Sequence, residues 1–116
     1  MRPDQRGAVT AELALGIPLL LSLTWGLVWL LSVGEAQVRI VDAAREAARA
    51  AARGDAPAAC AARGEQVAPG STVVVTTRGG EAVSSATASV APPGGWWGFL
   101  PSVSLHAEAV AAAEET

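Results

Sequence analysis

The segment RGAVTAE at residues 6–12 runs into LALGIPLLLSLTWGLVWLLSVG at residues 13–34, and these two segments decide the fold. The second segment holds 22 residues without a charge. As a helix that rises about 1.5 Å per residue, it would extend over roughly 33 Å, the thickness of a bilayer core. Pro18 is tolerated there, because neighbouring groups in a membrane protein satisfy the freed backbone carbonyl. We therefore predict a membrane-spanning N-terminal helix over residues 8–34.

The charges in front of the apolar segment indicate its orientation and leave one carboxylate unexplained. Arg2 and Arg6 outweigh a single acid, Asp4, and arginines beside a membrane helix favour the cytoplasmic side. We expect a single-pass protein of the cell membrane with its C-terminal domain outside.

Glu12 stands at the start of the apolar run, where burying an unpaired carboxylate in lipid costs on the order of 1 to 3 kcal/mol. An acid at this position requires a positively charged partner.

The spacing of Gly7, Ala8 and Glu12 in front of an apolar helix resembles a type IV prepilin processing site. In that family a membrane aspartyl peptidase cuts after the glycine, so the resemblance implies cleavage between Gly7 and Ala8 and a leader at residues 1–7. It also implies a role in assembly for Glu12. In pilins this acid meets the freed amine of a subunit's first residue and sets the axial register in the filament core.

The chain as a whole most resembles TadE-like minor pilins of tight-adherence pilus systems. The resemblance is carried by RGAVTAELALGIP at residues 6–18 and VDAAREAARAAARGD at residues 41–55. The sequence departs from the family at two positions: Ala8 stands where many pilins have Phe, and Leu13 stands where major Flp pilins often have Tyr. Whether the subunit lies in the shaft, at the tip or in the membrane therefore stays open. The resemblance implies a structural subunit of the cell membrane or of an extracellular pilus. Its implied partners are the prepilin peptidase, other pilin subunits and pilus assembly proteins.

Residues 35–54 are predicted to extend the helix beyond the membrane as an amphipathic segment that ends at Gly54. Its charged residues recur at steps of three and four, which predicts the ion pairs Glu35–Arg39 and Glu46–Arg49. The opposite face is rich in alanine. Such a narrow face would pack either on the chain's own sheet or on a helix of a neighbouring subunit.

Residues 55–116 are predicted to form a small extracytoplasmic domain. A short helix is expected from Pro57 to about Arg63, with proline in its first turn. The pair Gly79-Gly80 has the length and chemistry of a two-residue hairpin loop. Strands are predicted from β-branched runs and from alternation of apolar and polar residues at 71–78, 82–90 and from Val103 onward. The predicted fold class is α+β, with the long helix packed against a three-stranded antiparallel sheet.

The loop before the third strand concentrates aromatic residues outside the membrane helix. It reads PPGGWWGFLP at residues 92–101 and contains Trp96, Trp97 and Phe99. Exposed apolar groups of this size are typical of contact surfaces. Two interpretations remain open: a contact surface for a partner or a membrane, and a flap that covers the open face of the sheet.

The composition excludes several functional classes. A net charge of −3 argues against a nucleic-acid partner. The single histidine, His106, has no cysteine or carboxylate cluster with metal-ligand spacing around it, and the sequence contains neither a nucleophile elbow nor a phosphate loop. We therefore predict no catalytic residue, no metal site, no cofactor and no enzyme activity. Cys60 is the only cysteine and is interpreted as a small apolar filler, with pairing between subunits as the alternative.

Two other functions are compatible with parts of this pattern. The chain could be a secreted β module whose signal peptide is cleaved near Gly34, since Ser32 and Gly34 are small residues at the right spacing. Against this, the apolar run exceeds the roughly 7 to 15 residues of a usual signal peptide. The chain could also be a single-pass membrane assembly factor that never enters a pilus.

Overall fold

The fold is taken from a computed structural model that describes residues 3–113, excluding the side chains of residues 3, 4, 95 and 96. A long helix is followed by a short helix and a three-stranded antiparallel sheet, which confirms the predicted α+β class. The elements in chain order are α1 Pro3–Ala52, α2 Pro57–Val67, β1 Thr72–Arg78, β2 Glu81–Val90, the 3₁₀ helix η1 Gly95–Phe99, and β3 Val103–Ala112.

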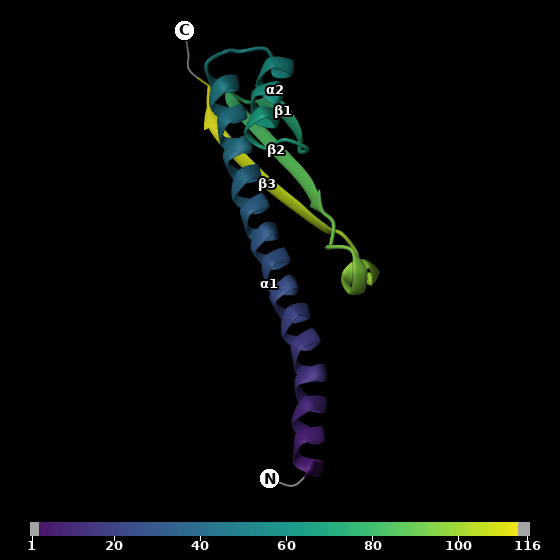
Figure 1. Ribbon diagram of the computed structural model, residues 1–116. Coiled ribbons are helices and arrows are strands. Elements are labelled where there is room, and N and C mark those ends of the chain that lie inside the picture. Colours follow the sequence, from purple (N-terminus) through teal and green to yellow (C-terminus); the bar gives the residue numbers. More distant parts are fainter. Residues whose placement is uncertain (1–2, 114–116) are drawn as a thin grey trace.

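Helix α1 is the axis of the molecule. It runs for 50 residues without interruption through Pro18 and Gly34, so the apolar segment and the amphipathic segment form one rod, as predicted. The molecule measures 85 × 22 × 20 Å. Figure 1 shows the sheet and α2 gathered along the C-terminal half of α1, whereas the N-terminal half projects alone. Strand β3 ends at the end of the molecule opposite the start of α1.

The connection from α1 to α2 follows the predicted helix-stop chemistry. Gly54 adopts a left-handed φ of 93°, and its N–H donates to the carbonyl of Ala51 at 3.0 Å, as at a glycine C-cap. Helix α2 begins at Pro57 as expected but ends at Val67, one turn beyond the predicted end near Arg63. The extra turn contains Gly64, which is buried against α1 and β1. Tertiary packing therefore overrides the weak helix propensity of this glycine.

The sheet has the strand order β1-β2-β3, with both pairs antiparallel. Arg78 pairs with Glu81 across Gly79-Gly80, whose φ angles are 55° and 82°. Two successive positive φ values define the type I′ turn that suits a two-residue hairpin. The predicted hairpin is confirmed.

The core lies between the C-terminal half of α1 and one face of the sheet, and most of its buried residues are alanines. Ser84 of β2 is fully buried, and its hydroxyl donates to the carbonyl of Ala44 in α1. Such a bond requires a close approach of strand and helix, which alanine permits. The alanine-rich face therefore packs on the chain's own sheet. The core comprises Ile40, Ala43, Ala44, Ala47, Ala68, Val73, Ala86, Leu105 and Ala107.

One of the two predicted ion pairs forms. Arg39 pairs with Glu35 across one helical turn. The predicted pair Glu46–Arg49 is wrong, because no ion pair within 4.0 Å joins these described side chains. Exposed pairs of this kind contribute about 0 to 1 kcal/mol, too little to overcome the entropy of two long side chains reliably.

Candidate functional site

The N-terminal half of α1 carries a long, largely uncovered apolar surface. None of its most apolar window is buried inside the structure, and the helix is long and apolar enough to cross a membrane. Exposed apolar patches on soluble proteins rarely exceed a few hundred Å², so a cover from outside the chain is required. The surface includes Leu13, Leu15, Ile17, Leu19, Leu20, Leu21, Leu23, Trp25, Leu27, Val28, Leu30 and Leu31.

Gly7 and Ala8 lie in the first turns of α1, both exposed and helical. The Thr10 hydroxyl donates to the Arg6 carbonyl at 2.9 Å, which spans the Gly7–Ala8 peptide bond. A Cβ placed on Gly7 would meet no atom within 4 Å. Nothing in the described chain therefore requires glycine at this position, so any such requirement would come from a partner.

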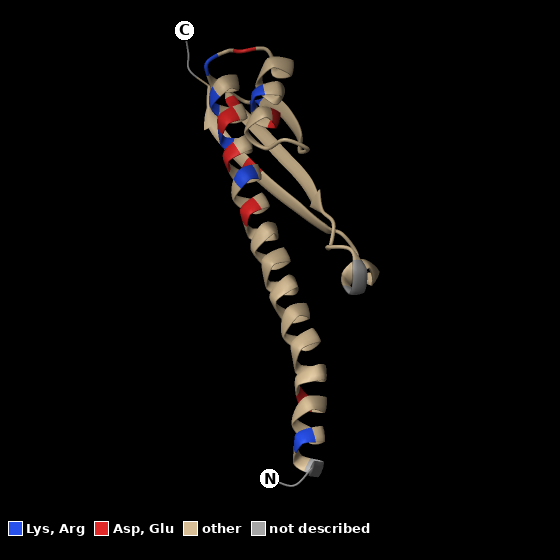
Figure 2. Cartoon of the chain, in the orientation of Figure 1, with Lys and Arg blue, Asp and Glu red and all other residues tan. Residues whose placement is uncertain are grey.

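Glu12 is exposed on α1, one turn beyond Ala8. Among the side chains that the structure describes, the Glu12 carboxylate has no ion pair within 4.0 Å. Residues 13–34, between Glu12 and Glu35, contain no charged side chain, and Figure 2 shows this long uncharged stretch of α1. The carboxylate is thus isolated on an apolar helix, and none of the described side chains supplies its cation.

The aromatic loop contacts α1 rather than the sheet. The Trp29 indole N–H donates to the Ala91 carbonyl at 3.1 Å. The Trp97 ring lies against Gly26, because a Cβ placed there would be 3.1 Å from the ring atom Cζ2. Phe99 is 79% exposed, and the Trp96 side chain lies outside the described residues. The structure brings Trp97 to α1 but leaves it about 21 Å along the helix from Glu12.

The flap interpretation of this loop is wrong. Val74 and Val110 remain exposed on the open face of the sheet, and η1 extends past the end of the sheet in Figure 1. The reason is the hydrogen bond from Trp29, which holds the start of the loop against α1. A contact surface for a membrane or a partner stays a prediction.

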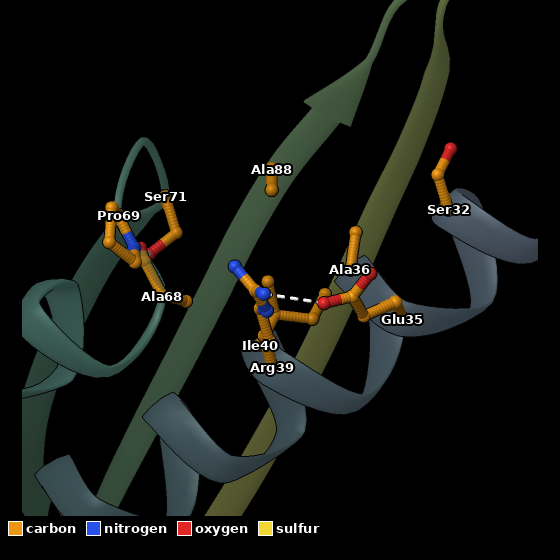
Figure 3. A pocket seen from close by; sticks show the side chains of 9 residues that line it. All are labelled: Ser32, Glu35, Ala36, Arg39, Ile40, Ala68, Pro69, Ser71 and Ala88. Atoms are coloured by element: carbon orange, nitrogen blue, oxygen red, sulfur yellow. Dashed lines mark hydrogen bonds and ion pairs between the residues drawn. The ribbon is translucent and has the colours of Figure 1, made fainter. Parts of the chain in front are cut away.

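A small pocket of about 160 Å³ lies where α1, β2 and the link from α2 to β1 meet. Arg39 and Glu35 face each other at its edge in Figure 3. Since these two charged groups pair with each other, the pocket offers no free charge to a ligand. Its lining consists of Ser32, Glu35, Ala36, Arg39, Ile40, Ala68, Pro69, Ser71 and Ala88.

Groups with catalytic or metal-binding chemistry are dispersed. No three His, Cys, Asp or Glu side chains among the described residues come together to hold a metal ion. His106 is exposed on the outer face of β3. Cys60 is fully buried, and burial raises the pKa of its thiol. A buried, protonated thiol is a poor nucleophile, so the structure supports the filler interpretation over pairing between subunits.

The sequence analysis did not identify Gly26 and Gly64 as residues that make close tertiary contacts. Gly26 receives the Trp97 ring, and Gly64 lies 3.0 Å, measured from an added Cβ, from the Ala43 carbonyl oxygen. Neither residue carries a local signal, because each partner is distant in sequence.

Comparison with known proteins bears on the N-terminal half. Residues 7–49 match the family described as TadE-like protein. No curated protein and no solved structure matches the chain. The matched stretch begins at Gly7, contains Glu12 and the whole apolar segment, and ends under the sheet. The resemblance predicted from the sequence is thereby confirmed over this stretch, and the apolar part of α1 fits membrane anchoring.

Proposed function

We propose that this chain is a structural pilin-like subunit of a tight-adherence pilus, anchored in or assembled from the cell membrane through α1. The proposal rests on one observation: the segment that matches the family contains the apolar segment of α1. The residues similar to TadE-like proteins, 7–49, include the apolar half of α1, whose most apolar window is not buried in the described structure. A bilayer, or the packed helices of neighbouring subunits, would cover this window.

The proposed division of the chain follows from this role. Residues 1–7 are the leader, residues 8–34 the membrane segment, residues 35–54 the helical extension, and residues 55–116 the domain outside the cell membrane. Arg6 remains on the cytoplasmic side. The proposed partners are the prepilin peptidase, which cuts between Gly7 and Ala8, other pilin subunits and pilus assembly proteins.

Glu12 carries the proposed assembly mechanism. A carboxylate buried among packed helices is tolerated only when a cation pairs with it, and its own described chain supplies none within 4.0 Å. Cleavage after Gly7 creates a cation, the α-amino group of Ala8. Pairing of this amine with Glu12 of an adjacent subunit would allow association and define the axial step between subunits.

The contacts of the aromatic loop support this role over the signal-peptide alternative. Cleavage near Gly34 would remove Trp29 and Gly26, which hold the loop. The outer domain would lose a hydrogen bond and an aromatic contact formed in the complete chain.

The Gly7→Leu variant tests the processing step. Gly7 and Gly16 both face open space, with no atom within 4 Å of an added Cβ, so Gly16→Leu is a matched control for the added bulk. After expression with the prepilin peptidase, we expect wild type and Gly16→Leu to begin at Ala8 and Gly7→Leu to keep its leader. Intact mass and N-terminal sequencing of the membrane-extracted protein measure this. A mature N-terminus at Glu35 would establish the signal-peptide function instead.

A further inference from the structure

The loop between β2 and β3 lies at the level of the apolar segment. Its contacts on α1 are Gly26 and Trp29, whereas the charged part of α1 begins at Glu35. Gly26 precedes Gly34 by eight residues, or about 12 Å along the helix. Figure 1 shows η1 displaced from the sheet toward the N-terminal half of α1. The outer domain therefore reaches back along the helix toward the membrane.

The chemistry of the loop fits a bilayer interface better than water. Residues 91–101 contain no charged side chain. Phe99 is 79% exposed, and Trp25 on the neighbouring helix surface is 58% exposed. Tryptophan and other aromatic residues concentrate where headgroups meet acyl chains, because their rings are apolar while the indole N–H forms hydrogen bonds.

The length of α1 places the outer interface at the same level. A hydrocarbon core of roughly 30 Å takes about 20 helical residues, counted here from Leu13. If Glu12 marks the inner boundary, the outer boundary falls near Ser32, about one helical turn beyond Trp29. The contacts of the loop at Trp29 and Gly26 then lie about 4 to 9 Å inside this boundary, the depth of an interfacial group.

We propose, on the premise that α1 spans the membrane as inferred above, that residues 91–101 form an interfacial foot that binds the outer surface of the lipid bilayer. Trp97 rests on Gly26, and Phe99 inserts at the boundary between headgroups and acyl chains. The foot gives the outer domain a second attachment beside α1. It thereby holds the sheet at a defined height above the membrane until the subunit is extracted.

Depth-dependent quenching of a fluorescent probe tests this inference in the full chain. In a Cys60→Ala background, Phe99→Cys is labelled with an environment-sensitive dye in vesicles of phosphatidylethanolamine and phosphatidylglycerol. Leu21→Cys, in the middle of the apolar segment, and Thr76→Cys, on the open face of the sheet, are the matched controls. Leu21 and Thr76 are both exposed in the isolated chain. Differences in quenching between the two positions therefore report whether lipid or water surrounds the dye.

We expect a nitroxide attached near the lipid headgroup to roughly halve the emission at position 99, as for a group at the interface. A nitroxide deep in the acyl chains should quench position 21 most, and aqueous iodide should quench position 76 most. Iodide quenching at position 99 equal to that at position 76, with position 21 still lipid-quenched, would overturn the foot and leave the membrane anchor intact. Protection from both quenchers at position 99 would also overturn it, because protein would then cover the loop. Absence of lipid quenching at position 21 would contradict both proposals.

Discussion

A buried glycine shows how closely the two helices approach each other. Gly64 of α2 faces the backbone of α1 on one side and Val73 of β1 on the other. An added Cβ would lie 3.0 Å from both the Ala43 carbonyl oxygen and the Val73 Cγ2 atom. The carbonyl belongs to the helix backbone and cannot rotate away, so a methyl group here would force the two helices apart by a few tenths of an ångström.

We expect Gly64→Ala to destabilise the outer domain by about 1 to 3 kcal/mol, the usual cost of overpacking a dense core. Helix propensity alone would give the opposite sign, because it favours alanine over glycine by roughly 0.5 to 1 kcal/mol of stability. The burial of Cys60 in the same helix provides the measurement, since its thiol reacts with labels only when the domain unfolds. The midpoint of urea-dependent labelling should fall.

The exposed position Ala62 supplies the matched control for this variant. Ala62→Gly should lower the midpoint only by the amount that follows from the lower helix propensity of glycine. A Gly64→Ala midpoint at or above wild type would show that the crossing of α1 and α2 relaxes freely.

At the scale of elements, the β2–β3 hairpin is attached to α1 at two levels. Its base packs through the core, where the Ser84 hydroxyl bonds to the Ala44 carbonyl. Its tip is held by Trp29 and by the contact of Trp97 with Gly26. The tip contact is far from the core, so it can be altered separately.

We expect Trp29→Phe to loosen the tip of the hairpin without unfolding the domain. The variant keeps an aromatic ring but loses a hydrogen bond worth about 0.5 to 1.5 kcal/mol, so amide hydrogen exchange in residues 95–100 should accelerate roughly two- to tenfold. Mass spectrometry of the full chain in detergent measures this rate.

Trp25→Phe is the control, because Trp25 lies four residues away and is 58% exposed. It should leave the exchange of the loop unchanged. Equal acceleration in both variants would mean that general loss of tryptophan, rather than the bond to Ala91, releases the loop.

At the scale of the whole molecule, the chain separates two kinds of surface along one rod of 85 Å. Charges cluster around the C-terminal half of α1 and on α2, and an uncharged stretch separates them from Glu12 and Arg6 (Figure 2). This polarity suits a protein whose one half lies in lipid, or in a bundle of like helices, while the other half lies in water.

We expect Glu12→Leu to remain in the membrane and to be cleaved, while its incorporation into pili falls sharply. Removing the charge lowers the cost of membrane insertion, so an anchor without assembly function would accumulate at least as well as wild type. Glu12→Gln should resemble Glu12→Leu, because the amide keeps the shape but not the charge that pairs with the Ala8 amine. Immunoblots of sheared pili and of membranes measure the two pools.

Glu108 is exposed on β3, so Glu108→Gln controls for the loss of one negative charge elsewhere. It should assemble as wild type does. Wild-type incorporation of both Glu12 variants would show that this carboxylate is not an assembly contact.

Local patterns in the sequence determined the secondary structure. The charge-free run predicted the uncovered part of α1, Gly79-Gly80 predicted the hairpin turn, and alternation from Val103 predicted β3. Glu12 stood out as a carboxylate at the start of an apolar run, whereas the family resemblance alone singled out Gly7. Each of these signals depends on neighbouring residues, through helix length, turn conformation or the alternation of side chains along a strand.

Only the tertiary structure decided what each element contacts. It placed Trp97 on Gly26, directed the loop along α1 instead of over the sheet, and closed α2 onto Ala43 through Gly64. It also left Glu46 and Arg49 unpaired with each other, although their spacing permits a pair. The physical reason is that these outcomes depend on the free space and hydrogen-bond partners between elements distant in sequence, and that space exists only after the alanine-rich face of α1 has packed on the sheet.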